Sequence, residues 1–487
     1  MLKILAALLF LVPSLAWADN LSFPNIAAME AVTDPAVGLV ANVAGYTQPN
    51  DGGGGTFTVV RGSLISANCT GGDGGTTFQA ASSQGGCLTD RYWKRSIGDY
   101  VTPEDFGGQS SVTTDQASYW NKAISYAENN LGTCALFGGG PYYISSLTPI
   151  STDFTCLQFN NTEIVPYAAS STILTLSASH VTFIGMPYVN NSGTAKTSVV
   201  GMVVGPANPA STTNSIQNFN TFGMGCWDLT DCIDFKPGPR YSGADSEQYW
   251  NNVNFWSRDT LRTIWLANAS DNIGGGANNN IFSGTIYQTG GTVNAGVQID
   301  EGQHNDFKFL SCNGVNGGTS PLSTPSCFRV AANAAGGQTN SDNIIEDIRT
   351  ESDTCDINSD TSFLSVLSNG PATNCGTAHP AVNLATNGSN ANPVAIPGFG
   401  YQANSQISAY PNAMSVVNSI YGLWIETGGL QLWTPTTVSS LPTCNAANKG
   451  LIEAVTDANS PSYNSTLTGG STTYTLALCN GSSWVAH

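Results

Sequence analysis

Charged side chains are scarce in this chain, and positive ones most of all. Lys, Arg, Asp and Glu make up 10% of the 487 residues, with 15 Lys or Arg against 33 Asp or Glu, and the formal net charge is −18 at pH 7. Such a surface repels a phosphate backbone, which excludes nucleic acid as a partner. A strongly anionic polymer is disfavoured for the same reason unless a cation or a local basic patch intervenes. A neutral or weakly acidic partner is easier to accommodate.

Long apolar runs are also missing after the first 18 residues. No later segment approaches the roughly 20 apolar residues that a transmembrane helix needs. Residues 1–18 have the pattern of a signal peptide: Lys3 supplies positive charge, residues 4–12 form a short apolar core, and residues 16–18 (Ala-Trp-Ala) form a cleavage site. The pattern predicts cleavage after Ala18 and a secreted or periplasmic protein that does not associate with a membrane.

Metal-binding motifs are absent too, because the chain has only four His and no CxxC motif. We therefore expect no zinc and no resident cofactor. The 12 cysteines all follow the signal peptide, and an even number in an exported chain predicts disulfides. Many connectivities are open to 12 cysteines, but their spacing favours pairing of neighbours: Cys69 with Cys87, Cys134 with Cys156, Cys226 with Cys232, Cys312 with Cys327, Cys355 with Cys375, and Cys444 with Cys479.

Helical periodicity occurs in one segment only. With 53 Gly and many turn-forming and β-branched residues, the composition favours many short strands. Residues 113–129 are the exception: Thr113 and Gln116 can form a capping box, and Trp120, Ala123, Ile124 and Ala127 form one apolar stripe. This spacing makes Trp120 a core residue rather than a functional one.

Strand-sized segments recur from Tyr142 onward and can be laid over one another. Residues 262–267 match residues 296–300 and 327–331, and each segment is followed by a polar turn and a strand that starts with Asn. The leading residues are Asn280, Asn305 and Asn343, and Asn252 fits the same pattern. Recurrent Asn at one corner is physically sensible, because Asn tolerates the left-handed conformation and its amide can bond to the next coil.

Two N-terminal stretches suggest how these strands are arranged. Residues 45–60 (GYTQPNDGGGGTFTVV) place a tight Gly turn before a strand, and residues 101–108 (VTPEDFGG) lead through the helix into residues 138–144 (GGGPYYI). This order resembles the start of bacteriophage tailspikes and other pectate-lyase-like right-handed parallel β-helix proteins. The resemblance implies a polysaccharide as partner and a homotrimer as assembly.

The resemblance also implies an all-β fold with four parts. We expect the signal peptide at 1–18, a small Gly-rich N-terminal head at 19–100, a right-handed parallel β-helix with an N-terminal capping helix at 101–435, and a small C-terminal β module at 436–487. In the module, residues 451–455 and 474–478 would pair as strands stapled by Cys444 and Cys479. Capping or assembly is the favoured role of this module, and glycan contact is the alternative.

Alternation along the matched segments identifies the side chains that face outward. Ile264, Leu266, Val297, Ile299, Phe328 and Val330 would fill the interior. Their neighbours form an outward column of Trp265, Gln298 and Arg329, with Asp300 beside it between Ala267 and Ala331. An aromatic ring, an amide, a guanidinium and a carboxylate on adjacent coils suit a sugar.

Asp300 is the leading catalytic candidate, and Glu301 adjoins it. The alternative is that residues 300–302 are a solvated acidic turn. His304 is a candidate substrate-binding residue, although a lone histidine in a turn more often has no functional role. Further acidic candidates are Glu346 and Glu351, for which salt bridges with Lys308 and Arg349 are the simpler explanation. Asp259, close in sequence to Trp256 and Trp265, is another candidate. Trp256 and Tyr287 are candidate sugar-binding residues.

Coil geometry restricts the chemistry. Carboxylates on adjacent coils, about 4.8 Å apart, approach the separation of roughly 5 Å in retaining glycosidases, and carboxylates two coils apart approach the 6.5–9.5 Å or so of inverting enzymes. The paired-aspartate, His-Gly and Arg-x-Lys signatures of the similar polygalacturonases are absent. These missing signatures leave the reaction unidentified. A lyase would need a base such as Lys, Arg, Tyr or His and a group that neutralises the uronate carboxylate, and only six scattered Lys follow the signal peptide. We therefore expect a glycoside hydrolase. The alternatives are a polysaccharide lyase, which would use Ca²⁺ or a basic patch, and a non-catalytic glycan-binding surface or fibre protein.

Overall fold

The protein is described by a computed structural model in which the chain divides into two compact units, residues 1–415 and 416–487. The structure describes residues 20–62, 72–81, 90–194, 196–206, 217–236, 248–267, 276–289, 295–313, 326–330, 343–346, 349–351, 357–359, 364–367, 382–384, 407–409 and 436–487. The predicted signal peptide and the cysteine pairs Cys69–Cys87 and Cys355–Cys375 lie outside these ranges. Within them, no helix is long and apolar enough to cross a membrane.

The N-terminal head is a five-stranded sheet with one short helix. The sheet order is β1-β2-β3-β5-β4, and its core contains the fully buried Met29, Phe57 and Trp93. Gly52 has a φ of 89°, as the predicted tight turn requires, and the Asp51 carboxylate accepts hydrogen bonds from four backbone N–H groups around it. The elements are β1 (Leu21–Phe23), α1 (Ile26–Glu30), β2 (Val40–Val43), β3 (Gly55–Arg61), β4 (Thr77–Gln79) and β5 (Arg91–Arg95).

Arg95 joins the head to the short helix η2 (Pro103–Phe106). Its buried guanidinium forms an ion pair with Asp105 at 3.0 Å and donates hydrogen bonds to the carbonyls of Gly53, Gly54 and Gly75. A buried charge is tolerated only when it is paired and hydrogen-bonded, and Arg95 meets both conditions.

The predicted helix is present as α2 (Ala117–Asn129). It begins four residues later than expected and has no Thr113–Gln116 capping box: the Gln116 side chain instead accepts from the Gln109 N–H and donates to Thr114. Trp120 is fully buried, as predicted, and stacks on Phe137 with ring centroids 4.0 Å apart.

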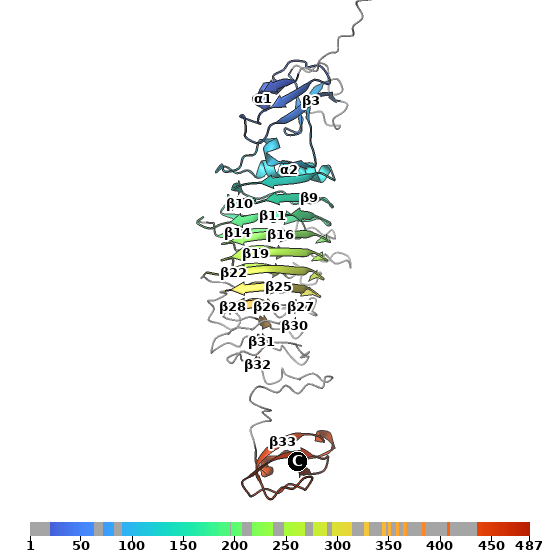
Figure 1. Cartoon of the computed structure of the whole chain (residues 1–487), viewed down its shortest axis with the longest axis vertical. Coiled ribbons are helices and arrows are strands. Elements are labelled where there is room, and N and C mark those ends of the chain that lie inside the picture. The colour runs from blue at the N-terminus through green and yellow to red at the C-terminus, as the bar shows by residue number, and fades with distance from the viewer. Residues whose placement is uncertain are drawn as a thin grey trace, which may run out of the picture. The chain divides into compact units, whose positions relative to one another are not determined.

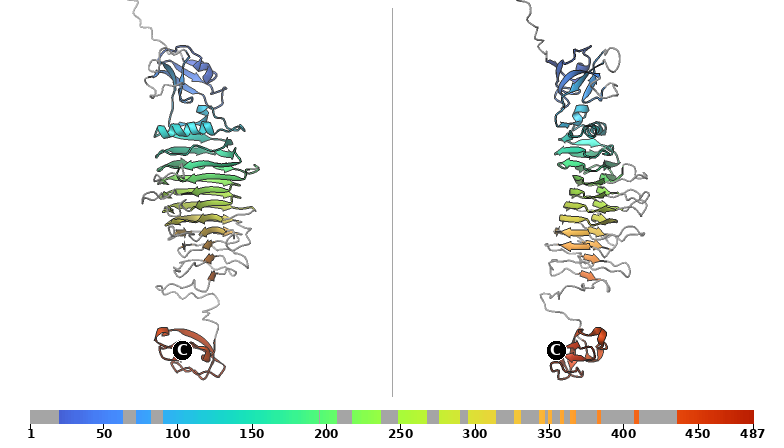
Figure 2. Two further views of the ribbon diagram at one scale, coloured as in Figure 1. Left: turned by 180° about the vertical axis from the view of Figure 1, so that it is seen from behind. Right: turned by 90° about the vertical axis from the view of Figure 1, so that its right-hand side faces the viewer.

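Three parallel sheets form the β-helix, and its coils are stacked one above the other (Figures 1 and 2). The predicted fold class, an all-β parallel β-helix with a small N-terminal β domain, is confirmed. We call the 14-stranded sheet of the described residues sheet I, the nine-stranded one sheet II and the four-stranded one sheet III. One coil passes from sheet III through sheet I to sheet II, as in β18 (Gln248–Tyr249), β19 (Asn252–Arg258) and β20 (Arg262–Leu266).

Sheet I has 14 strands and sheet II has nine among the described residues. Sheet I comprises β6 (Tyr100–Val101), β7 (Cys134–Gly138), β8 (Tyr142–Ile144), β9 (Cys156–Asn160), β10 (Glu163–Pro166), β12 (Thr182–Ile184), β13 (Tyr188–Asn190), β16 (Thr221–Trp227), β19 (Asn252–Arg258), β22 (Ile281–Tyr287), β25 (Asp306–Asn313), β27 (Asn343–Glu346), β28 (Arg349–Glu351) and β30 (Leu364–Leu367). Sheet II comprises β11 (Ser170–Leu176), β14 (Ser198–Val204), β17 (Asp231–Phe235), β20 (Arg262–Leu266), β23 (Ala295–Ile299), β26 (Ser326–Val330), β29 (Ile357–Ser359), β31 (Val382–Leu384) and β32 (Ile407–Ala409). Sheet III comprises β15 (Gln217–Asn218), β18 (Gln248–Tyr249), β21 (Ala277–Asn278) and β24 (Gly302–Gln303).

The interior follows the predicted inward columns. Ile264, Leu266, Val297, Ile299 and Phe328 are fully buried. Aromatic rings continue this core from coil to coil, with centroids 5.2 Å apart between Phe137 and Phe159 and 4.8 Å apart between Phe282 and Phe307. Buried apolar area of this kind is the main source of stability in the fold.

A ladder of buried asparagines lines the corner between sheets III and I. Each Asn side-chain oxygen accepts from the backbone N–H of the ladder residue one coil earlier, at 3.0–3.1 Å. The predicted Asn280, Asn305 and Asn343 belong to this ladder, but the prediction of Asn252 was wrong by one residue. Asn251 is the ladder residue, and Asn252 is exposed at the start of β19.

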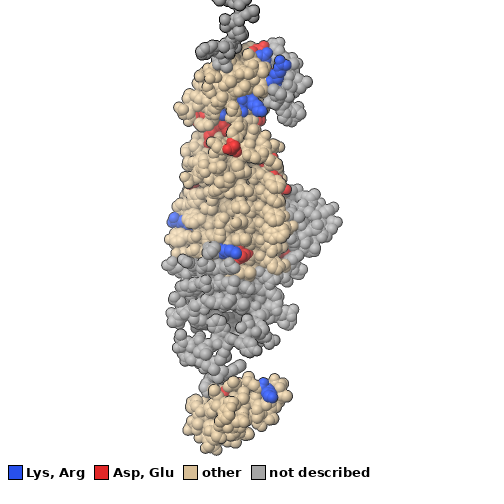
Figure 3. All heavy atoms as spheres, turned by 45° about the vertical axis from the view of Figure 1, so that its right-hand side comes forward, with Lys and Arg blue, Asp and Glu red and all other residues tan. Residues whose placement is uncertain are grey.

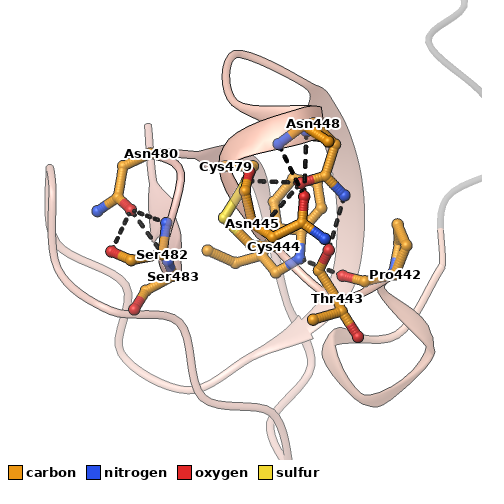
Figure 4. Close-up of a disulfide and its surroundings, with 11 residues drawn as sticks. Pro442, Thr443, Cys444, Asn445, Asn448, Cys479, Asn480, Ser482 and Ser483 are labelled. Atoms are coloured by element: carbon orange, nitrogen blue, oxygen red, sulfur yellow. Dashed lines mark hydrogen bonds between the residues drawn. A yellow bond between two sulfur atoms is a disulfide. The ribbon is translucent and has the colours of Figure 1, made fainter.

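Four of the six predicted disulfides are present among the described residues: Cys134–Cys156, Cys226–Cys232, Cys312–Cys327 and Cys444–Cys479. The last one lies in the C-terminal module, which contains η3 (Val438–Ser440), η4 (Ala446–Asn448) and the antiparallel strands β33 (Ile452–Ala458), β34 (Thr473–Cys479) and β35 (Trp484–Ala486). Beside it, Asn445 and Asn448 cap the short helix η4 reciprocally (Figure 4).

Candidate active site

The outward column predicted from the alternation is in register on sheet II. Trp265 pairs with Gln298, and Gln298 pairs with Arg329, one residue from each successive coil. The pairing continues one coil upstream to Asp234, which the sequence analysis did not include. The column therefore carries a carboxylate, an indole, an amide and a guanidinium in that order.

Asp300 lies directly after β23, where its carboxylate joins this column. Trp265 Nε1–H donates to Asp300 Oδ2 at 2.6 Å, and Gln298 Nε2–H donates to Oδ1 at 2.8 Å. The side chain is partly exposed, whereas its neighbour Glu301 is only 1% exposed. Asp300 is thus held by two side chains of the predicted column, unlike a freely solvated turn residue.

Two cations contact the ring of Trp265. The Arg262 guanidinium lies 3.6 Å from the ring centroid and forms a bidentate pair with Asp231, at 2.6 and 3.0 Å. Lys236 Nζ lies 5.3 Å from the same centroid. These contacts fix the orientation of the indole, whose N–H is directed at Asp300.

Asp234 is the most perturbed carboxyl group of this face. It is fully buried and forms an ion pair with Lys236 at 2.9 Å, while its Oδ1 has no hydrogen-bond partner among the described residues. Burial, reinforced by the negative charge of Asp231, raises the pKa of Asp234 to about 7, although Lys236 and Arg262 oppose the shift. A buried carboxyl that titrates near neutrality can hold a proton for transfer.

Extending the sequence alignment one coil upstream would have found these residues. Residues 231–235 (DCIDF) place Ile233 opposite Ile264, and this register puts Asp231 opposite Arg262 and Asp234 opposite Trp265. Asp234 is opposite Trp265 and, one coil further, opposite Gln298, and Asp300 follows Gln298 by two residues. The two backbones are therefore about 9.6 Å apart across the coils and about 6.6 Å apart along the strand, or about 12 Å in all. Their carboxyl groups reach the roughly 6.5–9.5 Å of inverting glycosidases only where the two side chains lean toward each other.

The structure does not bring the other acidic candidates to this face. Asp259 lies before β20, whereas Asp300 follows β23, so a strand of five residues, about 16 Å, separates their positions. The Asp259 carboxylate accepts from the backbone N–H and hydroxyl of Thr289. Glu346 is opposite Lys308, as predicted, and Glu351 is opposite Asn313, both on sheet I. The side chains of these two glutamates lie outside the described part of the chain.

The remaining candidate binding residues also lie elsewhere. His304 is exposed at the corner between sheets III and I, with a φ of 54°. Trp256 and Tyr287 project from sheet I, whereas Trp265 projects from sheet II, so the three do not form one row. The described residues contain no group of three or more His, Cys, Asp or Glu that could hold a metal ion.

Comparison with known proteins bears on the architecture. Residues 22–99 match the model of the phage tail protein small four-stranded beta-sheet domain. A β-sheet head that matches this family model is thus followed by a parallel β-helix. The architecture is tailspike-like. No curated protein matches the chain.

Three of the solved structures to which the tailspike-like chain is similar are the following. The first is the enzymatically active domain of tailspike protein 2 of bacteriophage CBA120, at 12% identity over 96% of this chain and 79% of that chain, with a TM-score of 0.46. The second is tailspike protein gp49 of Acinetobacter baumannii bacteriophage Fri1, a capsular polysaccharide depolymerase, at 11% identity over 72% of this chain and 66% of that chain, with a TM-score of 0.45. The third is WceF of Pantoea stewartii, a glycan biofilm modifying enzyme, at 13% identity over 68% of this chain and 47% of that chain, with a TM-score of 0.35. These likenesses are too low to carry a reaction or a substrate over to this chain.

Proposed function

We propose that this protein degrades a polysaccharide and that it is a glycoside hydrolase acting on the outward face of sheet II. The observation that carries the proposal is the arrangement of two carboxyl groups in different environments around one tryptophan. Asp300 accepts two hydrogen bonds at a partly exposed position, and Asp234, two coils away, is fully buried with a pKa raised to about 7. A carboxyl group whose pKa is raised by burial can act as the general acid of glycoside hydrolysis, with a second carboxylate as the base.

Each group would have a separate role. Asp234 would donate its proton to the glycosidic oxygen as the bond to the anomeric carbon breaks. Asp300 would accept a proton from the water that attacks the anomeric carbon from the opposite face. Two carboxyl groups this far apart leave room for that water, which favours inversion over retention of configuration. The Gln298 amide and the part of the Trp265 ring that Arg262 does not cover would position the sugar, and Arg329 would donate hydrogen bonds to its hydroxyl groups.

The substrate would be neutral or weakly acidic. Lys236 and Arg262 are each paired with an aspartate, so the described face has no large excess of positive charge to hold a polyanion. Charged side chains are also sparse on the coloured surface in Figure 3. No metal or other cofactor is required for this reaction, and activity in excess EDTA tests this. Activity that depends on added Ca²⁺ would point to a lyase.

Product analysis with Asp300→Asn tests the proposal. Incubation with neutral and acidic polysaccharides should release new reducing ends, and the variant should lose about 10²- to 10⁴-fold in rate. Asp306→Asn is the matched control, because Asp306 is an acidic residue of sheet I that pairs with Lys308. An unsaturated product that absorbs ultraviolet light would instead identify a lyase. Binding without any product would identify a non-catalytic glycan-binding protein.

Export and assembly belong to the same proposal. N-terminal sequencing of the secreted or periplasmic protein should begin at Asp19. Light scattering of the mature protein at micromolar concentration should give about three times the mass of one chain, as the tailspike-like architecture leads us to expect. A mass near 50 kDa would contradict the trimer but not the reaction, since the residues of the proposed site lie in one chain.

A further inference from the structure

A second row of aromatic side chains lies on the outward face of sheet I. Tyr188 pairs with Gly225 and through it with Trp256, while Trp227 pairs with Arg258 and through it with Tyr287. Four successive coils therefore contribute one aromatic residue each, alternately in two adjacent columns. The residues between them, including Cys226, Phe255 and Ile286, are buried, so the aromatic side chains face outward.

These rings do not cover one another. Tyr188 lies over Gly225, where an added Cβ would be 2.8 Å from the ring, and its centroid is 5.6 Å from that of Trp256 at an angle of 57°. Tyr188 and Trp227 are tilted by 41°. Trp227, Trp256 and Tyr188 are partly exposed and Tyr287 is 39% exposed, so ring surface is available to a ligand.

A second aromatic column lies at the corner between sheets III and I. Phe154, His180 and Phe219 stack nearly parallel there, at 20° and 25°, and Phe154 and Phe219 are 60% and 48% exposed. The row on sheet I differs from this column in the tilt of its rings.

The polar groups of this face suit a sugar. The Arg258 guanidinium lies 4.5 Å from the Trp227 ring centroid, and its Nε has no hydrogen-bond partner among the described residues, although Asp259 lies 3.4 Å away as an ion-pair partner. Ser283 donates to Asn254 on the exposed surface nearby. Aromatic faces beside hydroxyl, amide and guanidinium groups bind the apolar face and the hydroxyls of a sugar ring.

We propose that Tyr188, Trp227, Trp256 and Tyr287 form a second glycan-binding surface, which holds the polymer at a position separate from the cleavage site on sheet II. The row spans about 14 Å over four coils, so it can contact more than one sugar unit. The identity of its ligand as the polymer that is cleaved rests on the proposed function. The row would raise the affinity for long chains, because a chain held on sheet I has a higher effective concentration at sheet II.

Affinity electrophoresis separates this proposal from the reaction. Gels containing dextran, galactomannan, xanthan or alginate would be run with Asp300→Asn alone and combined with Tyr287→Ala or Trp256→Ala. Each aromatic substitution should weaken the retardation constant about 2- to 10-fold for the polysaccharide that retards the parent. Tyr167→Ala is the matched control, because Tyr167 is 46% exposed and lies outside the row. Circular dichroism and melting temperature identify a variant that fails to fold, and Tyr287→Phe serves as the milder substitution.

The kinetic readout distinguishes the two proposals. In the active protein, Tyr287→Ala should raise KM for the long polymer and leave kcat and the hydrolysis of short oligosaccharides unchanged. If the row variants lose retardation and the active protein cleaves no glycan, the binding surface is supported and the hydrolase is refuted. Equal retardation of the parent, the row variants and the control would overturn the binding surface, as would a parent that none of the polysaccharides retards.

Discussion

Trp265 and Asp300 are joined across one coil boundary by a hydrogen bond of 2.6 Å from the indole nitrogen to the carboxylate. Neither residue could hold the other alone: the indole is fixed by Arg262 on its ring, and the carboxylate is fixed by Gln298 on its second oxygen. The proposed base is therefore positioned by side chains from two successive strands of sheet II. Residues held by such mutual contacts lose little conformational entropy when substrate binds.

Replacing Trp265 with Phe should lower kcat by about 10- to 100-fold. The ring for Arg262 remains, but the N–H donor to the charged carboxylate is lost, and such hydrogen bonds contribute about 1.5–3 kcal/mol. Steady-state kinetics on the polysaccharide that the protein cleaves measure the effect. Trp484→Phe is the matched control, because it removes an indole N–H that donates to the Pro442 carbonyl in the C-terminal module. Equal rates for both variants would show that the indole N–H has no part in the reaction.

Asp234 should set the alkaline limit of activity. A general acid must be protonated, and the pKa of Asp234 is raised to about 7 chiefly by burial, so kcat/KM should fall as pH rises through about 7. Lys236 opposes this shift, because its positive charge favours the ionised carboxylate. Lys236→Met should therefore raise the pKa of Asp234 and move the alkaline limb to higher pH. A limb that stays in place, or moves to lower pH, would assign the titration to another group.

The raised pKa of Asp234 also predicts how the stability of the protein changes with pH. The folded-state pKa of Asp234 lies above the ordinary value of 3.8, so the folded protein binds more protons than the unfolded chain between those two values. Stability from this group is full below the unfolded pKa and is lost as pH rises through the folded pKa. The melting temperature of Asp234→Asn relative to the parent should consequently increase between pH 5 and pH 8. A difference that is constant with pH would contradict the raised pKa.

Alternation was sufficient to place the sheet II column, since the pattern of Ile264, Leu266, Val297 and Ile299 leaves only one register with an apolar interior. Alternation alone does not indicate to which of the three sheets each strand belongs. Trp256 and Trp265 are nine residues apart in the sequence, and the turn at Asp259 and Thr260 between β19 and β20 places them on different sheets. Sheet assignment depends on where the chain turns, and polar turns of similar composition occur at all three corners.

Alternation in the sequence did not predict Asp234 as a site residue, for a related reason. All five residues of β17 are buried, so the strand shows no alternation between exposed and buried positions. Burial of its two aspartates depends on Arg262 and Lys236, which are contributed by the next strand and by the following residue. Such ion pairs can be inferred from the alignment of neighbouring coils but not from the sequence of a single strand.

Asn251 and Asn252 provide a sharp test of the ladder, because they are adjacent and chemically identical. Asn251 is 1% exposed and donates to the Gln217 carbonyl at 3.1 Å and to Asn280 Oδ1 at 2.8 Å, whereas Asn252 is exposed. Asn251→Ala leaves buried polar groups without partners, at about 1–3 kcal/mol for each. We expect it to lower the free energy of unfolding by about 3 kcal/mol or more, and Asn252→Ala to change it by about 0.5 kcal/mol or less. Guanidinium titration followed by circular dichroism measures both, and a reversed order would restore the register expected from the sequence.

Every cysteine of the mature protein should be oxidised. Four disulfides link cysteines that are neighbours among the cysteines of the sequence, with separations of 6 to 35 residues. In a solenoid, each coil contacts only the coils beside it, so the same local pairing is expected for Cys355 with Cys375. Cys69 and Cys87 are then the remaining pair, and both belong to the N-terminal head. Peptide mapping without reduction should recover six cross-linked pairs, and a thiol reagent should label no cysteine in guanidinium. Labelling at several of the 12 positions would contradict both the pairing and the export of the chain, because unpaired thiols persist where the compartment is reducing.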